Sequence, residues 1–415
     1  MPTIPIRWAS WFGDTDLGLT FPPEWEVSLH AMRGGPALSP AQIEAGLDQS
    51  IDWPGIQQRA GAIRKVAIAV DDLTRPTPAW QILSPLLTRL QRAGIGPERI
   101  CILMALGTHA IIPRDGLIRK LGRPVVSQIE VRNHSPFSGL IDLGRSSAGF
   151  VMKVNRTFAE ADLRFGISCI LPHSDAGFSG GAKIVMPGLC GIETIEQVHG
   201  MAPVGIGFQR DRAGMVEGNA LREQMEAIAR TAGLQVSINL VLDAHRQVIG
   251  LFAGDVVEAH RQAVQLARQV LATPMPRQVD VAILNAYPKD TEFLQVVNAL
   301  HIISANREMF IQPEGTIVLT TAASEGRGFH YLMCPEGIRP FVFDRASMLA
   351  GRRLLIYSPG VSLPDVRTVF PPDVEFYTEW PAVERRLHEL HGRRSRVAVF
   401  PCASMQIPAE GRDDT

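Results

Sequence analysis

Cysteine is scarce in this sequence, and its scarcity limits the kinds of site that the chain can build. The 415 residues include five cysteines, which are widely spaced and never form a Cys-x-x-Cys pair. We therefore expect neither a disulfide framework nor a structural zinc site, and a reducing cytoplasm fits this usage. The N-terminus lacks a basic region leading into an apolar segment, and no apolar run reaches about 18 residues. The sequence thus predicts a cytoplasmic protein that does not enter a membrane.

An excess of charge of either sign is also missing. Lys and Arg number 41, Asp and Glu number 42, and the formal net charge is −1. This balance creates no field that would attract nucleic acid or an anionic membrane surface, so neither is expected as a partner. With 46% hydrophobic residues, the composition is that of an ordinary globular protein. The length predicts two domains.

Short apolar runs alternate with amphipathic segments along most of the chain. Residues 66–70 form a compact apolar run, a polar loop and an amphipathic segment follow, and residues 100–106 begin the pattern again. This alternation predicts an α/β fold with mainly parallel sheets flanked by helices. The pattern restarts after residues 273–276 (Thr-Pro-Met-Pro), which have the composition of a linker. We expect an N-terminal domain of residues 1–272, a C-terminal α/β domain of residues 273–415, and an active site in the cleft between them.

Polar residues follow several of the expected strands, where a site would form. They are Asp71-Asp72-Leu73-Thr74-Arg75, Gly107-Thr108-His109, Asn133-His134 and the segment from Pro172 to Lys183. Parallel strands bring their carboxyl ends to one edge of a sheet, and ligands bind beyond that edge. We therefore expect these segments to share one crevice.

The segment from Pro172 to Lys183 is the strongest candidate for chemistry. Its glycines let the backbone approach a ligand closely, and His173 and His199 flank Lys183, whose amine could form a covalent bond. A Walker A loop is excluded, because Ile184 follows the lysine where that motif needs a hydroxyl to hold magnesium.

The complete set of motifs resembles the nickel-pincer lactate racemase family. In the order of that family, the matching residues are Asp71-Asp72-x-Thr74-Arg75-Pro76, Gly107-Thr108-His109, Asn133-His134, Pro172-His173-x-x-Ala176-Gly177-Phe178-Ser179-Gly180-Gly181-x-Lys183, Pro187-Gly188, His199 and Tyr287-Pro288-Lys289-Asp290. The resemblance extends over roughly residues 65–330, and the long glycine-lysine motif is its most specific part.

The resemblance implies an isomerase: a racemase or epimerase acting at C2 of a small 2-hydroxy acid. The implied cofactor is the nickel pincer nucleotide, pyridinium-3,5-bisthiocarboxylic acid mononucleotide with nickel. By resemblance, Lys183 holds it covalently through a thioamide, His199 ligates the nickel, and Asp72 helps to hold the nucleotide. Residues 1–272 would then be the cofactor-binding catalytic domain. Cofactor-biosynthesis enzymes are implied as partners.

The same resemblance assigns the groups that act on the substrate. His109 and His173 would be the two acid/base groups, one on each face of the substrate, while Arg75 and Lys289 would orient its carboxylate or carbonyl. Hydride transfer to an electrophilic pyridinium avoids a carbanion, and a histidine can take the hydroxyl proton as the hydride leaves. Inversion needs a base for each enantiomer's hydroxyl, and the ordinary pKa of imidazole, about 6.5, suits both.

One departure from the family pattern concerns the substrate. After Gly-Thr-His the family usually continues with an arginine and then an acidic residue, whereas Ala110-Ile111-Ile112 follows here. The roles of two further histidines stay open. His134 could support the site, contact a ligand or belong to a turn, and His330 could face the cleft or belong to a loop. The remaining histidines, including His260 and His301, are expected at solvated or helix-surface positions.

Two other functions are compatible with these residues. The same cofactor could serve a hydroxy-acid oxidoreductase that releases a keto acid without inverting the substrate. Alternatively, the chain could be a non-catalytic protein that binds the cofactor. The presence of both His109 and His173 argues against simple binding, because storage would need Lys183 and His199 but no pair of bases.

Overall fold

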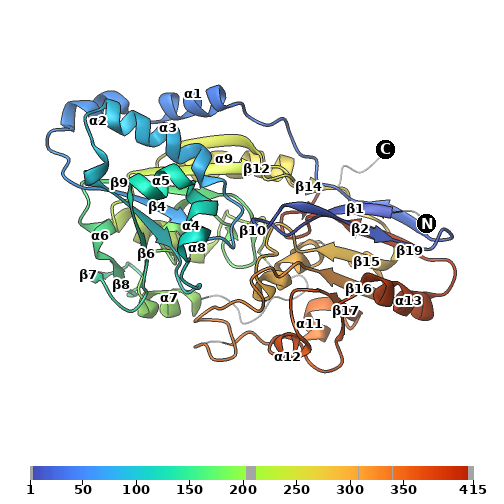
Figure 1. The fold of residues 1–415 in the computed structure, drawn as a ribbon. Coiled ribbons are helices and arrows are strands. Elements are labelled where there is room, and N and C mark those ends of the chain that lie inside the picture. Colours follow the sequence, from blue (N-terminus) through green and yellow to red (C-terminus); the bar gives the residue numbers. More distant parts are fainter. Residues whose placement is uncertain (1–2, 202–211, 307, 339, 410–415) are drawn as a thin grey trace.

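The computed structural model describes residues 3–201, 212–306, 308–338 and 340–409, and its core is built on two six-stranded sheets (Figure 1). The strands of the first sheet are β4 (Val66–Asp71), β5 (Ile100–Ala105), β6 (Glu130–Asn133), β9 (Leu163–Cys169), β12 (Val236–Leu242) and β13 (Val248–Gly254). Their order is β13-β12-β9-β4-β5-β6, and all neighbours are parallel except β12 and β13.

The second sheet is parallel throughout. Its strands are β3 (Glu26–Leu29), β15 (Val279–Asn285), β16 (Ile311–Thr320), β17 (Arg353–Tyr357), β18 (Glu375–Tyr377) and β19 (Arg396–Phe400). They follow the order β18-β17-β16-β15-β19-β3.

Helices cover both faces of the first sheet because its central strands are apolar on both. Every residue of β4 and β5 is buried, as expected for parallel strands enclosed between two layers. One face packs against α1 (Pro40–Ser50), α2 (Trp53–Arg59), α3 (Ala79–Arg92), α4 (Arg114–Leu121), α5 (Arg123–Gln128) and α9 (Glu258–Val270). The other packs against α6 (Arg156–Ala159), α7 (Ile192–His199) and α8 (Ala220–Thr231).

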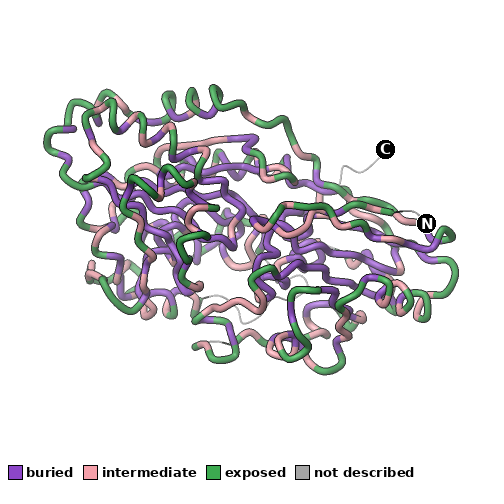
Figure 2. Tube along the Cα trace, viewed as in Figure 1, coloured by how far each residue is buried: buried purple, intermediate pink, exposed green. Residues whose placement is uncertain are grey.

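The second sheet is also covered on both faces, and Figure 2 shows the buried trace concentrated in the two sheets. One face packs against the 3-10 helix η3 (Phe293–Leu300), α10 (His301–Ser304), α11 (Arg345–Leu349) and α12 (Leu363–Arg367). The other packs against α13 (Trp380–His391) and the hairpin of β1 (Thr3–Trp8) and β2 (Thr15–Thr20). These layers confirm the α/β prediction.

Short elements complete the described part of the chain. They are the two-stranded ribbons β7 (Leu140–Arg145) with β8 (Val151–Asn155), β10 (Pro172–His173) with β11 (Gly177–Phe178), and β14 (Ala272–Thr273) with β20 (Ile407–Pro408), and the 3-10 helices η1 (Pro97–Arg99) and η2 (Gly181–Ile184). Among the helices that the structure describes, none has the length and apolar character needed to cross a bilayer.

The N-terminal strands lie with the second sheet, which differs from the predicted grouping of residues 1–272. β3 pairs in parallel with β19, and Ile6 and Leu19 of the hairpin pack in one core cluster with Val281 of β15. The sequence does not show which sheet these strands join, because strand pairing depends on contacts between residues far apart in the chain. The boundary between residues 272 and 273 stays a prediction.

Residues 292–306, which the sequence predicts to be helical, are largely helical in the structure. Most of the segment is the 3-10 helix η3, and one α-helical turn follows it. Nearly the whole segment is buried against the second sheet.

A buried lysine holds the loop after β4 in place. The side chain of Lys120, at the end of α4, is fully buried. Its ammonium lies 2.7 Å from Asp71 Oδ1 and donates to the carbonyls of Asp72 and Arg75, both at 2.8 Å. The charge of Lys120 therefore fixes both ends of the loop that carries Asp72 and Arg75.

Replacing Lys120 should destabilise the protein strongly. K120M leaves the Asp71 carboxylate buried without its cation, and losing one member of such a pair costs about 3–5 kcal/mol. The free energy of unfolding from urea denaturation is the measurement. K65M at the exposed Lys65 is the matched control, and it should change that free energy by less than about 0.5 kcal/mol. Equal stability of the two variants would contradict the bracing role of Lys120.

Candidate active site

The loop after β4 turns sharply around Asp72. The Asp72 carboxylate accepts hydrogen bonds from the backbone N–H of Thr74, at 2.7 Å, and from its hydroxyl, at 2.5 Å. Thr74 Oγ1 in turn accepts from the Arg75 guanidinium at 2.8 Å. Burial raises the pKa of Asp72, but its interactions with His109 and Arg75 and the hydrogen bond from Thr74 outweigh burial and lower the pKa overall. The buried Asp72 therefore stays ionised and orients Arg75.

The loop after β5 touches the end of the glycine-lysine segment. Gly107 has φ +55° and donates its N–H to the carbonyl of Gly188 at 2.9 Å. A Cβ added to Gly107 would lie 3.4 Å from the Pro187 carbonyl oxygen, so both the backbone angle and the close approach favour glycine here. This contact places His109 beside the loop that carries Lys183.

A buried arginine organises the glycine-lysine segment. Arg222 of α8 is fully buried and donates to the carbonyls of Ala176, Phe178 and Gly180. Its guanidinium also lies 3.1 Å from His260 Nε2. The sequence gives no sign of this role, because a single arginine at the start of a helix carries no signal for carbonyls 42 to 46 residues away.

Two histidines expected at solvated or helix-surface positions are buried instead. His260 lies under Gly181, where an added Cβ would come within 2.9 Å of its ring, and its Nε2 lies 3.0 Å from the Ser179 carbonyl oxygen. His301 is buried in the α-helical turn that follows η3, and its Nε2 lies 3.3 Å from Asn298 Oδ1. The prediction was wrong for both, since tertiary packing covered the helix face that each occupies.

His173 and Lys183 are in direct contact. The backbone N–H groups of Asp175 and Ala176 lie 3.2 and 3.3 Å from His173 Nδ1, so that atom accepts and carries no proton in the neutral ring. The ring proton is then on Nε2, which lies 3.3 Å from Lys183 Nζ. A ring held in this tautomer donates to the lysine, which requires a neutral amine.

Burial and nearby cations favour that neutral amine. Burial, together with the charges of Arg222 and Arg75, lowers the pKa of Lys183 to about 7, although Asp175 opposes the shift. Burial and then the positive charge of Lys183 lower the pKa of His173 well below its ordinary value. The geometry and the electrostatics agree that Lys183 can act as a nucleophile near neutral pH.

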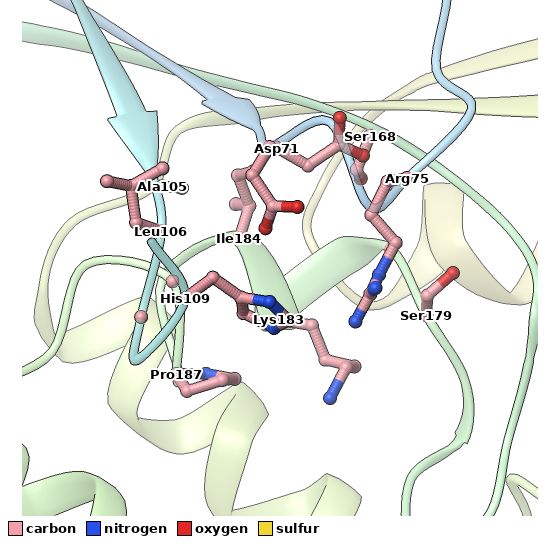
Figure 3. Close-up of a pocket in the computed structure, with 14 residues that line it drawn as sticks. Asp71, Arg75, Ala105, Leu106, His109, Ser168, Ser179, Lys183, Ile184 and Pro187 are labelled. Carbon is pink, nitrogen blue, oxygen red and sulfur yellow. The ribbon is translucent and has the colours of Figure 1, made fainter. Parts of the chain in front are cut away.

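A pocket of about 450 Å³, its open mouth included, lies at the carboxyl ends of β9, β4 and β5 (Figure 3). Its lining includes Asp72, Arg75, His109, Ser168 and Lys183. The figure shows the ends of the Arg75 and Lys183 side chains and the His109 ring extending into the same space. Three of the four predicted strand-end segments therefore share this pocket, whereas Asn133 and His134 do not line it.

Two pocket atoms are available to a ligand. Within the described residues, His109 Nδ1 and Ser168 Oγ are buried and have no hydrogen-bond partner. Burial lowers the pKa of His109 to about 4 against the opposing charge of Asp72, with Arg75 and Lys183 lowering it further. His109 is therefore a neutral imidazole at physiological pH, able to accept a proton.

The other predicted site residues, His173, Lys289 and His199, are not among the residues that line this pocket. Lys289, fully buried after β15, donates to Asn298 Oδ1 at 3.0 Å, and its charge lowers the pKa of both His109 and His173. His199 ends α7 and its Nδ1 lies 2.8 Å from the Ile195 carbonyl oxygen. That bond places the ring proton on Nδ1 and the lone pair on Nε2, the form that binds metals.

The structure distinguishes the two histidines whose roles were open. His134 is buried between the Cys190 carbonyl and the Asn155 amide, at 2.9 and 3.1 Å, which fills both ring nitrogens with structural contacts. His330 packs edge-on against His109, with ring centroids 4.5 Å apart. Burial is the largest cause that lowers the pKa of His330, and interactions with His109 and His199 are the next largest. His330 is therefore close enough to both residues to interact with them.

Comparisons with known proteins point to one family. Residues 12–205 match the model of the lactate racemase N-terminal domain. The lactate racemase of Lactiplantibacillus plantarum is 31% identical over 290 residues, which cover 69% of this chain and 66% of that protein. The lactate racemase of Thermoanaerobacterium thermosaccharolyticum is 26% identical over 290 residues, which again cover 69% of this chain and 66% of that protein. The aligned part is thus just under two thirds of each curated relative.

Solved structures show the same fold. The lactate racemase apoprotein of T. thermosaccharolyticum superposes with a TM-score of 0.74 at 21% identity, covering 99% of this chain and 100% of that one. A protein from Thermotoga maritima superposes with a TM-score of 0.65 at 18% identity, covering 91% of this chain and 100% of that one.

The amine of Lys183 should titrate far below an ordinary lysine. Because its pKa is lowered to about 7, the amine is mostly neutral above that pH, whereas an unperturbed lysine titrates at about 10.4. Competitive labelling with acetic anhydride between pH 5.5 and 10.5, resolved by peptide mass spectrometry, measures the midpoint. The exposed Lys65 is the internal reference. A midpoint for Lys183 at or above 10 would contradict the lowering of its pKa by burial, Arg222 and Arg75.

Proposed function

Because this chain belongs to the lactate racemase family, we propose that it is a racemase or epimerase that inverts C2 of a small 2-hydroxy acid. Its lactate racemase relatives support the isomerase prediction. The observation that carries the proposal is the gathering of an arginine, a reactive lysine and two neutral imidazoles in one place. His109 and Lys183 line the pocket with Arg75, and His173 contacts Lys183.

The residues present fit the nickel pincer nucleotide. Lys183 supplies an amine with the lowered pKa that thioamide formation needs, and the unpartnered Ser168 hydroxyl faces the same pocket. His199 would ligate the nickel through Nε2, and Asp72 would help to hold the nucleotide. No group of three or more His, Cys, Asp or Glu in the described residues could bind a metal unaided, so the nickel would need donors from the cofactor. When bound, this cofactor would supply a hydride acceptor.

The side chains would have two further roles: cations would orient the substrate, and imidazoles would transfer protons. Arg75 and Lys289 would orient the substrate carboxylate or carbonyl, since both are cations that act electrostatically on His109 and His173. One imidazole, in its neutral form, would take the hydroxyl proton on one face of the substrate. The other, already protonated, would return a proton on the opposite face and become neutral, and the roles would exchange for the other enantiomer.

The proposal extends to where the protein works and what it depends on. Cofactor-biosynthesis enzymes would load it before it acts. All five cysteines are buried free thiols, which supports a cytoplasmic location.

Each imidazole should be essential for inversion. H109Q and H173Q keep side chains that can form hydrogen bonds but remove the base, and losing a general base typically costs about 10²- to 10⁴-fold in turnover. Racemisation of 2-hydroxy acids by cofactor-loaded protein is the measurement, with intact mass confirming equal loading. H245Q, at an exposed histidine outside the pocket, is the control. Full activity in either site variant would exclude the two-base mechanism, and release of a keto acid would favour the oxidoreductase.

Cofactor attachment and nickel binding should depend on different residues, Lys183 and His199 respectively. On protein co-produced with the cofactor-biosynthesis enzymes, we expect a mass adduct on Lys183 and one nickel per chain. K183A should lose both, whereas H199A should keep the adduct and bind nickel more weakly. Intact-protein mass spectrometry and elemental analysis provide the readout. An unmodified Lys183, when a known lactate racemase is loaded in parallel, would overturn the cofactor assignment.

A further inference from the structure

A second pocket adjoins the first and is lined from both halves of the chain. The two pockets share Asp72 and His109. From there the second pocket extends between Ala110–Pro113 on one side and Glu292 and Glu325 on the other. A substrate held between the histidines would have this space beside it, so the second pocket is placed to receive the substrate's side chain.

Backbone contacts hold the two glutamates close together. The N–H of Glu325 donates to the Thr291 carbonyl at 2.8 Å, and the N–H of Phe293 donates to the Gly326 carbonyl at 2.9 Å. Glu292 therefore lies between two fixed contacts. Gly328, with φ +79°, closes over it, because a Cβ added there would come within 2.6 Å of Glu292 Oε2. The carboxyl of Glu292 is thus positioned by rigid backbone.

Glu292 is buried, and one oxygen of its carboxyl lacks a hydrogen bond within the described residues. Its relative exposure is 5%, and Oε2 has no hydrogen-bond partner in the part of the chain that the structure describes. A buried carboxyl oxygen without a hydrogen bond costs free energy, so it suggests that a ligand group supplies the missing hydrogen bond. Burial, followed by the charges of Asp72 and Glu325, raises the pKa of Glu292 to about 8, and Arg75 opposes this shift.

The charges around the pocket favour a ligand that brings hydrogen to the carboxyl. With a pKa of about 8 the Glu292 carboxyl is mostly protonated at neutral pH, because its ionised form would be repelled by Asp72 and Glu325, while Arg75 and Arg119 favour ionisation of the two glutamates. A ligand O–H or N–H could donate to Oε2, and a positively charged donor would also offset the repulsion and so favour the ionised carboxylate. The opposite wall, Ala110-Ile111-Ile112, is apolar and suits the carbon chain that would carry the donor.

We propose that Glu292 forms a specificity subsite that selects 2-hydroxy acids whose side chain ends in a hydrogen-bond donor, either an ammonium or a hydroxyl group. The inference rests on the proposed function, since it assigns the second pocket to the substrate of the first. It also suggests what the departure from the family pattern at Ala110-Ile111-Ile112 does for substrate choice. The loop leaves space where the family usually has an arginine, and the polar recognition comes from Glu292 in the other half of the chain.

A matched substrate series tests the subsite. The probes are 2-hydroxypentanoate, 2,4-dihydroxybutanoate and 4-amino-2-hydroxybutanoate, which differ only in a terminal methyl, hydroxyl or ammonium group, together with their homologues one carbon longer. Calorimetry on cofactor-free protein measures their binding, and racemisation by loaded protein measures kcat/KM. We expect the ammonium or hydroxyl acid to exceed the methyl acid by about 10- to 100-fold.

Variants distinguish the two donors. E292Q keeps an acceptor oxygen but removes the charge, so the advantage of an ammonium should fall about tenfold or more while that of a hydroxyl should largely remain. E292L should abolish the advantage of both donors. E314Q, at an exposed glutamate outside either pocket, is the control and should preserve the order of the series.

The outcomes separate this inference from the proposed function. If loaded protein inverts the methyl acid at least as well as both donors, and E292L leaves that order unchanged, the subsite is wrong and the racemase proposal stands. If the donors bind cofactor-free protein through Glu292 but loaded protein inverts none of the series or lactate, the subsite stands and the racemase proposal fails.

Discussion

The parallel pairing of β9, β4 and β5 is the constraint on which the rest of the site depends. In-register parallel pairing brings the carboxyl ends of these three strands to one edge. The loops that leave this edge carry Arg75, His109 and the glycine-lysine segment. Because both faces of the strands are buried under helices, the loops start from rigid points, and small differences in their length are enough to set which side chains meet.

Buried cations then set the electrostatics of the site. Lys120 ties the Asp71–Arg75 loop to α4, and Arg222 ties the glycine-lysine segment to α8. Neither side chain reaches the pocket lining. Arg222 nevertheless acts on the chemistry, because its charge helps to lower the pKa of Lys183. The scaffold that positions the lysine amine therefore also keeps it neutral, and a covalent cofactor link requires a neutral amine.

The second sheet contributes from across the site. Lys289 follows β15, Glu292 precedes η3, and His330 lies against the ring of His109. The first half thus supplies Lys183, His109 and His173, while the second supplies a cation, a carboxyl and a third imidazole. Under the proposed function, the second half could change substrate preference without disturbing the groups assigned to the reaction.

The sequence by itself determined the α/β class, the strand-end positions of Asp72, Arg75 and His109, and the glycine-lysine segment. Apolar runs and turn residues are local signals, and parallel strands align their ends whatever the order of the sheet. Only the tertiary structure decided that β3 joins the second sheet, that Arg222 and His260 support the glycine segment, and that Glu292 is buried with an unpaired oxygen. These features depend on contacts between residues far apart in the chain. Burial, which makes a charge costly and shifts its pKa, exists only once the two halves have packed.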